Sequence, residues 1–301
     1  MKNDIYLKVD VDTWRGTVEG VPRLLKLFAR HQVRATFLFS LGQDHTGRAL
    51  RRVFRPGFLG KVGRTSVLSH YGLRTLLYGV LLPGPHIARQ GAEILRQAAT
   101  EGHQVGVHCH DHIRWQDYVA HKDAAWTRRE LEQAVFQFQE VFGYPPEVHG
   151  AAGWQVNAHA LVQQGSMGFR YASDTRGRFP FWPMMDGLKG GVPQLPTTLP
   201  TLDELLGREG WNAGNIHQAV IAATQETLPH GHVYTLHAEL EGMRLMPVME
   251  ELLLAWRAEG RRVDGLDILF NGLKDPLPRH QVVWGEVAGR TGQLALQGAS
   301  C

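Results

Sequence analysis

Residues 5–30 of the chain read IYLKVDVDTWRGTVEGVPRLLKLFAR, a stretch with the form of a strand followed by a helix. Ile5–Val9 is a short apolar run that leads into two aspartates, whereas Val21–Arg30 places apolar residues at helical spacing. A strand that leads directly into a helix is typical of βαβ units, in which neighbouring strands run parallel. The beginning of the chain therefore predicts a parallel α/β fold.

The same order of strand and helix recurs along the chain. Short apolar runs predict further strands at Ala35–Phe39, Gln104–Val107, Phe169–Ala172, Val192–Leu195, Val233–Leu236 and Arg262–Val263. Helical patterns occur at His86–Thr100, Thr127–Val141 and Met246–Glu259. This alternation predicts parallel strands, wound as an open sheet or as a barrel. Residues 278–301 carry less pattern, so we expect one main domain over residues 1–277 and a carboxyl-terminal tail with little core.

The composition narrows the class of protein. The chain has 301 residues, of which 43% are hydrophobic and 20% charged, as in a globular protein with a sizeable core. Its two cysteines, Cys109 and Cys301, form no disulfide framework, which favours a reducing compartment. Charges lie near the amino terminus where a signal peptide needs an apolar core, so we expect a cytoplasmic protein. No Walker or GxGxxG sequence follows the first strand, which argues against nucleotide binding.

Residues 45–92 lack Asp and Glu but mix basic with apolar side chains. The basic residues are Arg48, Arg51, Arg52, Arg55, Lys61, Arg64, Arg74 and Arg89. Such a segment can lie in a membrane interface while its cations meet lipid phosphates. We therefore expect an insertion that contacts an anionic membrane surface, and no nucleic-acid partner. The alternative is a solvated face beside an ordinary packed helix.

Polar side chains follow several of the predicted strands, at the point where each strand ends. They are Asp10, Asp12, His108, His112, Asp174 and His237. In parallel α/β folds the carboxyl ends of the strands converge on one face, where active sites lie. Each residue alone has an ordinary structural explanation, such as a helix cap for Asp12 or an interior hydrogen bond for His237. Their shared position favours a site.

One carboxylate and two imidazoles are suited to a divalent metal. Asp12, His108 and His112 provide that set if the chain turns helically between the two histidines. Asp10 would then be available as a base and His237 as an acid. The same donors also occur in non-haem iron oxygenases, but those place the histidine first in an HxD pattern. A metalloprotease needs Glu after the first His, where this chain has Cys109.

The motifs resemble those of the polysaccharide deacetylase family over roughly residues 5–270. The segment KVDVDTWRG matches an aspartate motif, His108–His112 matches a His-x-x-x-His motif, and Tyr234–His237 (YTLH) matches a late Leu-x-His motif. The resemblance implies a distorted (β/α) barrel with fewer than eight units. It also implies a metal on the second aspartate and the two histidines, with the first aspartate as base and the late histidine as acid. Because Val11 separates the aspartates, the roles of Asp10 and Asp12 are open to exchange.

Two departures distinguish this chain from the general family pattern. The third motif normally supplies an arginine, but residues 149–154 read HGAAGW. Asp174 matches the fourth motif as a further catalytic residue, but it lacks the usual arginine partner, for which Arg176 is a candidate.

These departures point to one branch of the family. The segments VDVDTWRGTVEGVPRLL, AAGW, SDTRGRFPF, PTTLPT and YTLHAELEG resemble its deformylases. The resemblance implies removal of a formyl group from a formamido-arabinose carried on undecaprenyl phosphate, with release of formate. The reaction would occur at the cytoplasmic face of the inner membrane, in lipid A modification and cationic peptide resistance.

Several assignments stay open at this stage. Arg176 and Arg178 are candidates for binding the substrate phosphate. The divalent metal could be zinc, cobalt, manganese or nickel, because His/Asp sites accept all four. A deacetylase of another N-acylated sugar and a non-catalytic lipid-sugar binding protein are the alternative functions.

Overall fold

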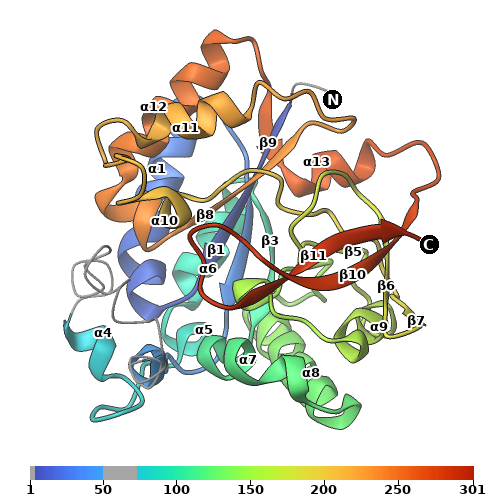
Figure 1. Cartoon of the computed structure of the whole chain (residues 1–301). Helices are drawn as coiled ribbons and strands as arrows, with labels where there is room; N and C mark the ends of the chain where they lie inside the picture. The colour runs from blue at the N-terminus through green and yellow to red at the C-terminus, as the bar shows by residue number, and fades with distance from the viewer. Residues whose placement is uncertain (1–3, 50–72) are drawn as a thin grey trace.

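A computed structural model describes residues 4–49 and 73–301 of the chain. Within these residues, seven parallel strands form one sheet in the order β5-β4-β3-β2-β1-β8, and β9 pairs with the first residues of β1. Helices lie around this sheet, and a separate hairpin crosses one side of it (Figure 1). The expected distorted (β/α) barrel with fewer than eight units is confirmed.

The strands of the main sheet are β1 Ile5–Val11, β2 Thr36–Ser40, β3 Gln104–Cys109, β4 Val148–His149, β5 Tyr171–Ala172, β8 His232–His237 and β9 Val263–Gly265. The α-helices are α1 Val21–His31, α4 Leu73–Leu77, α5 Ile87–Gln90, α6 Ala92–Thr100, α7 His112–Tyr118, α8 Ala124–Phe142, α9 Ala158–Ser166, α10 Leu202–Leu205, α11 Ile216–Ala223, α12 Met246–Ala258 and α13 Leu266–Asn271. Short π-type and 3₁₀ turns are η1 Gly16–Gly20, η3 Val119–His121, η4 Ala152–Trp154 and η5 Leu240–Arg244. No helix in the described part of the chain is long and apolar enough to span a membrane.

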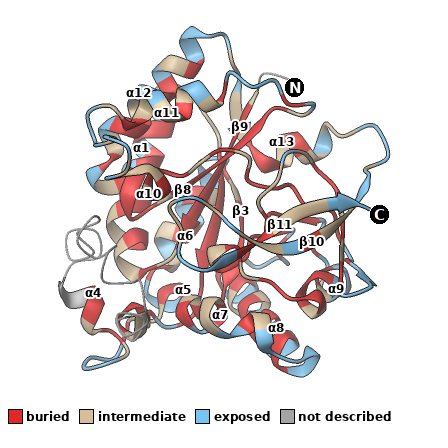
Figure 2. Cartoon of the chain, viewed as in Figure 1, coloured by how far each residue is buried: buried red, intermediate tan, exposed pale blue. Residues whose placement is uncertain are grey.

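Strand β1 lies between β2 and β8 in the sheet and is buried along its whole length (Figure 2). Successive side chains of a strand point to opposite faces. Leu7 and Val9 belong to the large apolar cluster that includes Leu24 and Phe28 of α1. The alternate residues of β1 include Lys8 and Asp10, which are also buried. The face of β1 turned away from α1 therefore carries the charges.

Residues 278–301, for which the sequence predicts a tail with little core, form a hairpin instead. Strands β10 (Arg279–Glu286) and β11 (Gln293–Ser300) pair antiparallel, and β10 also pairs with β6 (Trp182–Met185), which in turn pairs with β7 (Leu188–Lys189). Val282, Leu294 and Ala295 of the hairpin are buried. The sequence pattern is weak here because the hairpin buries only part of one face.

Two other segments differ from expectation or lie outside the description. Residues 192–195 form isolated bridges, in which Gln194 pairs with Ala172 and Phe181, rather than a strand. Pro193 and Pro196 have no N–H to donate, which explains why no longer ladder forms. Of the predicted basic insertion at 45–92, residues 50–72 lie outside the described part of the chain.

Candidate active site

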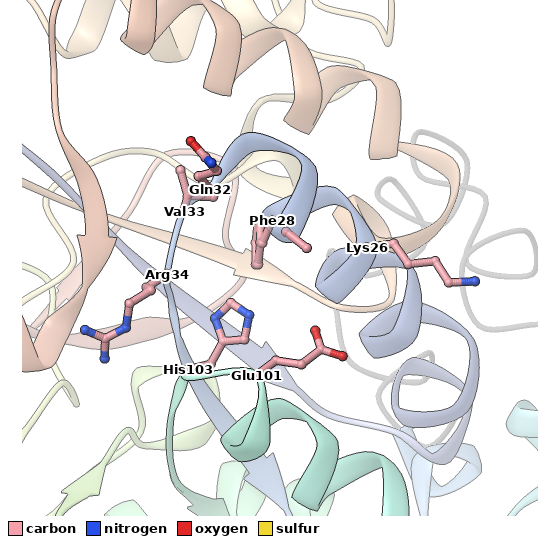
Figure 3. Close-up of a pocket in the computed structure, with 8 residues that line it drawn as sticks. Lys26, Phe28, Gln32, Val33, Arg34, Glu101 and His103 are labelled. Carbon is pink, nitrogen blue, oxygen red and sulfur yellow. The ribbon is translucent and has the colours of Figure 1, made fainter.

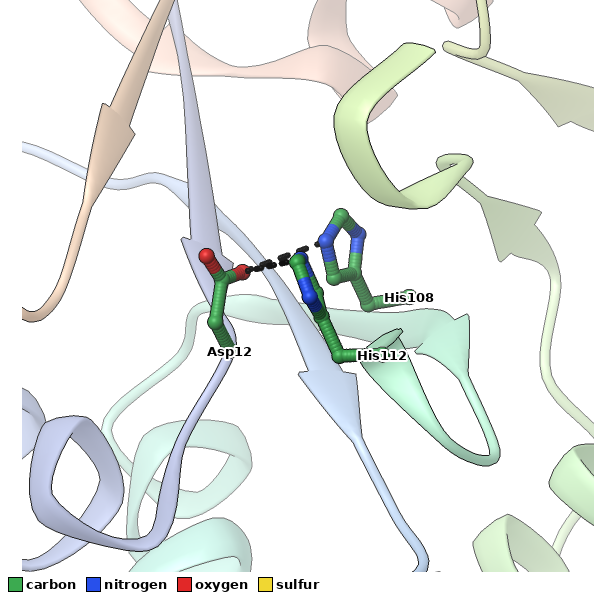
Figure 4. A group of neighbouring side chains, drawn as sticks. All are labelled: Asp12, His108 and His112. Carbon is green, nitrogen blue, oxygen red and sulfur yellow. Dashed lines mark ion pairs between the residues drawn. The ribbon is translucent and has the colours of Figure 1, made fainter. Parts of the chain in front are cut away.

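Asp12, His108 and His112 come together at the carboxyl end of the main sheet (Figure 4). One ligand atom from each lies within 4.8 Å of the others. Asp12 Oδ1 lies 3.2 Å from His108 Nε2 and 3.4 Å from His112 Nε2. Asp12 follows β1, His108 lies near the end of β3, and His112 begins α7. The Asp111 side chain caps α7 by accepting a hydrogen bond from Arg114 N, and the helical turn that follows aligns the two imidazoles.

The three side chains have the chemistry of a divalent metal site. His108 Nδ1 lies 2.6 Å from Gly150 O. Because a carbonyl oxygen can only accept, Nδ1 carries the proton and donates it, which leaves Nε2 with a lone pair directed at the cluster. Asp12 Oδ1 is buried and accepts no well-aligned hydrogen bond. Burial alone would raise the pKa of Asp12, but His112 and His108 outweigh it and hold that pKa well below its ordinary value. A charged carboxylate facing an imidazole lone pair fits a cation between them.

Glu239 holds Asp12 in place. Its Oε1 accepts hydrogen bonds from Asp12 N at 3.0 Å, Thr13 N at 2.8 Å and Thr13 Oγ1 at 2.8 Å. Burial, with the nearby charge of Asp12, raises the pKa of Glu239 to about 8. The sequence places Glu239 two residues after His237 but offers no sign of its contact with the turn after β1.

Asp10 is buried beside a buried lysine. Lys8 Nζ lies 3.4 Å from Asp10 Oδ2 and also donates to Ser173 O at 3.0 Å. Asp10 Oδ1 has no hydrogen-bond partner and lies 3.8 Å from His108 Nδ1. Sequence analysis did not single out Lys8, because a lysine within an apolar strand has no pattern of its own.

His237 ends β8 and stands opposite Asp10 in the register of β1 and β8. Its Nδ1 is buried without a hydrogen-bond partner, and Asp203 Oδ1 lies 3.9 Å away. Burial lowers the pKa of His237, but the carboxylates of Asp203 and Asp12 outweigh it, so that the pKa is raised. The candidate base Asp10 and the candidate acid His237 therefore lie at the same edge of the sheet as the metal cluster.

Asp174 is buried, and both of its carboxylate oxygens accept hydrogen bonds. Its Oδ1 accepts from Ala151 N at 2.8 Å and lies 2.7 Å from His149 Nδ1, while Oδ2 accepts from Gln164 Nε2 at 2.7 Å and Gln194 Nε2 at 3.0 Å. In the described part of the chain, the carboxylate within ion-pair range of His237 is that of Asp203. These contacts engage both oxygens of Asp174 and support the turn at residues 151–154, and the catalytic part expected for Asp174 stays a prediction.

The two predicted phosphate ligands are both engaged elsewhere. Arg176 Nη1 pairs with Glu204 and Nη2 donates to Leu199 O at 2.9 Å. Arg178 is 62% exposed and pairs with Glu226 on the surface. Arg176 also stacks on Trp154, with Cζ 5.0 Å from the ring centroid. Arg176 therefore lies near the site as part of its wall, whereas Arg178 does not join the cluster.

A cavity of about 540 Å³, shown in Figure 3, is lined by none of Asp12, His108 and His112. Its lining residues include Gln32–Arg34, just before β2, and His103, just before β3. It therefore lies at the amino ends of these strands, opposite the edge that carries Asp12 and His108. A second cavity, of about 260 Å³, is lined by Arg176, Glu204 and Val287 among others, on the side of the site near α10.

Comparisons with known proteins agree with this geometry. The sequence profile of the polysaccharide deacetylase family matches residues 2–172. The chain is 36% identical over 294 residues to a protein of Shewanella sediminis (strain HAW-EB3) named "Probable 4-deoxy-4-formamido-L-arabinose-phosphoundecaprenol deformylase ArnD", covering 97% of this chain and 94% of that one. A protein of Wigglesworthia glossinidia brevipalpis with the same name is 30% identical, covering 94% and 98%.

A solved structure shares the fold. A probable polysaccharide deacetylase from Pseudomonas aeruginosa PAO1 superposes with a TM-score of 0.58 at 17% identity, covering 89% of each chain. Because the family profile matches residues 2–172 and two relatives match along nearly the whole length, this chain belongs to the polysaccharide deacetylase family of hydrolases.

Proposed function

We propose that this chain is a metal-dependent deformylase that removes the formyl group from 4-deoxy-4-formamido-L-arabinose linked to undecaprenyl phosphate and releases formate. The role would belong to lipid A modification and resistance to cationic peptides such as polymyxin. The observation that carries the proposal is the convergence of Asp12, His108 and His112 with Asp10 and His237 at one edge of the sheet. Similarity to two relatives with that name supports the choice of substrate.

The reaction must overcome a weak electrophile and a poor leaving group. Asp12, His108 and His112 would hold the cation, which polarises the formyl oxygen and lowers the pKa of a water when bound. Asp10 accepts the proton of the attacking water through Oδ1, the oxygen that Lys8 does not occupy. His237 enters the reaction protonated and donates to the sugar nitrogen as the carbon–nitrogen bond breaks. The raised pKa of His237 supports that starting state.

The metal is expected to be zinc, cobalt, manganese or nickel. Two imidazoles and one carboxylate suit these ions, and they leave open positions for water and substrate. The burial of His108 and Asp12 also favours a bound cation over freely solvated side chains, because the cation compensates the buried carboxylate charge.

The lipid carrier requires contact with the cytoplasmic face of the inner membrane, as a peripheral protein. The described part of the insertion supports such a contact at a turn after α4, where Val80 is 52%, Leu81 75% and Leu82 39% exposed. Three consecutive exposed apolar side chains are unusual on a soluble surface. Arg48 packs at the base of this turn, donating from Nε to Gly79 O at 3.3 Å, and adds a cation for lipid phosphates.

Formate release from the formamido-arabinose lipid tests the proposed function. We expect release by the purified protein, loss of release on chelation, and recovery when Zn²⁺ or Co²⁺ is restored. The N-acetyl analogue of the lipid serves as the matched substrate, and its preferential hydrolysis would favour the alternative deacetylase. Absence of release with metal restored would favour a non-catalytic binding protein and contradict the proposal.

A further inference from the structure

The Nδ1 atom of His237 has an unusual surrounding. Nδ1 is buried and forms no hydrogen bond, and the nearest carboxylate oxygen is Asp203 Oδ1 at 3.9 Å. The backbone of the same residue is fixed, because His237 N donates to Glu241 Oε2 at 2.9 Å. The ring therefore stands in a defined place with one nitrogen turned toward Asp203.

Asp203 is held by two groups. It lies in the first turn of α10, where Thr201 Oγ1 donates to its Oδ1 at 2.6 Å. Arg290 Nη1 lies 2.8 Å from its Oδ2, and Arg290 Nη2 donates to its Oδ1 at 3.1 Å. A guanidinium that contacts both oxygens fixes the plane of a carboxylate as well as its charge. Burial would raise the pKa of Asp203, but Arg290 and His237 outweigh it and lower that pKa.

Arg290 comes from the loop between β10 and β11, within the segment for which the sequence predicts a tail. Figure 1 shows this loop beside α10. Gly289 has φ +91 and lies so close to Glu204 O that a Cβ atom there would overlap it. Arg290 Nε donates to Glu204 Oε1 at 3.0 Å, and its Cζ lies 4.8 Å from the centroid of Trp154. The loop is therefore docked on α10 rather than lying loosely over it.

We propose that Asp203, clamped by Arg290 of the carboxyl-terminal hairpin, is the positioning carboxylate of His237. The inference rests on the proposed function, because it assigns the surroundings of the acid in that reaction. Asp203 holds the proton on the ring and turns Nδ1 toward itself, which leaves Nε2 to donate to the sugar nitrogen. Asp174, the other carboxylate that the sequence motifs single out, has its oxygens taken by Ala151, His149, Gln164 and Gln194.

Five charged groups bear on the imidazole of His237. Asp203 of α10, Asp12 after β1 and Glu241 of η5 favour the protonated ring, and Arg290 of the hairpin opposes it. Glu239, just before η5, also attracts the protonated ring. We therefore expect opposite effects on the pKa of His237 from Asp203 and Arg290. Removal of the Asp203 charge should lower the pKa of His237, and removal of the Arg290 charge should raise it.

Nuclear magnetic resonance titration of the imidazoles, in metal-free protein, measures this directly without substrate. The His237 signals are assigned by their absence in His237→Gln. In Asp203→Asn we expect the pKa of His237 to fall by about one unit. In Arg290→Gln we expect it to rise. The exposed Asp186 and Arg279 provide matched controls, Asp186→Asn and Arg279→Gln, which should leave it unchanged. Unchanged titration of His237 in both Asp203→Asn and Arg290→Gln would overturn the proposal.

The kinetic counterpart separates this inference from the proposed function. With the lipid substrate, Asp203→Asn should lower kcat by about tenfold to a hundredfold with little change in KM, and should move the alkaline limb of the kcat profile to lower pH. If the alkaline limb of the kcat profile moved while the pKa of His237 stayed the same, the role of Asp203 would be contradicted. If no variant and no wild-type protein released formate while the titration shifts were observed, the proposed function would fail and the positioning of His237 would stand. If Asp203→Asn does not fold, the pKa of His237 in Arg290→Gln is the test, and an unchanged value would overturn the proposal.

Discussion

Lys8 Nζ lies 3.4 Å from Asp10 Oδ2 on an interior strand of the sheet, and neither side chain is more than 4% exposed. Both residues lie on β1 and project to the same face. The chain lacks the arginine of the family's third motif, and the cation beside Asp10 is Lys8 of the same strand. The ammonium also stands 5.2 Å from the centroid of Trp154, in the segment that replaces that motif.

Removing the charge of Lys8 alone should destabilise the folded protein. We expect Lys8→Met to lower the free energy of unfolding by about 3 kcal/mol, because Asp10 is left charged and unpaired in the interior. In an Asp10→Asn background the same substitution should cost about 2 kcal/mol less. Urea unfolding of the four proteins measures the coupling. The exposed pair Arg128 and Glu132 is the control, with expected coupling below about 0.5 kcal/mol. Additive effects of Lys8→Met and Asp10→Asn would show that the two charges do not interact.

Gly16 allows Glu239 to reach the turn after β1. A Cβ atom at this position would overlap Glu239 Oε1, the atom that accepts from Asp12 N and Thr13 N. We expect Gly16→Ala to weaken Zn²⁺ affinity by roughly tenfold, because the second shell of a metal site orients its ligands. Isothermal titration calorimetry measures the affinity, and Gly214→Ala, at an exposed position, is the control. Equal affinities in the two variants would count against a part for Glu239 in holding Asp12.

The exposed turn after α4 should bind anionic membranes. We expect Leu81→Glu to reduce sedimentation with phosphatidylglycerol vesicles, because it replaces the most exposed large apolar side chain with a charge of the same sign as the lipid. Leu188, on β7, is 45% exposed and supplies the matched control Leu188→Glu. Equal loss in both variants would indicate a general charge effect, and no loss in either would place the contact elsewhere.

Glu241 should make stability depend on pH. Burial raises its pKa to about 7 in the folded protein. The folded state therefore binds this proton more tightly than the unfolded chain, so its stabilising contribution is present below pH 4.5 and is lost as pH rises through about 7. We expect Glu241→Gln to gain roughly 3 kcal/mol relative to wild type between pH 4.5 and 8. Urea unfolding at both pH values measures this change, with exposed Glu140→Gln as control. A difference that does not vary with pH would contradict the raised pKa.

Local sequence patterns were sufficient for the sheet and for part of the site. The period of apolar residues identifies β1, α1 and β8, and the ends of those strands carry Asp10, Asp12 and His237. Residues that act through distant contacts could not be found this way. Glu239 meets Asp12 across 227 positions of sequence, and Arg290 meets Asp203 across 87. The hairpin was missed for the same reason, since β10 is stabilised by pairing with β6.

We propose that Asp12, His108 and His112 hold one divalent cation on which formate release depends. The most direct measurement is the amount of cation bound per chain, by elemental analysis of the dialysed protein, alongside formate release from the same samples. We expect about one cation per chain in wild type and in His110→Ala, and none in Asp12→Asn or His112→Ala, with release following the bound cation. Full formate release from protein without a cation, or undiminished cation in both ligand variants, would contradict it.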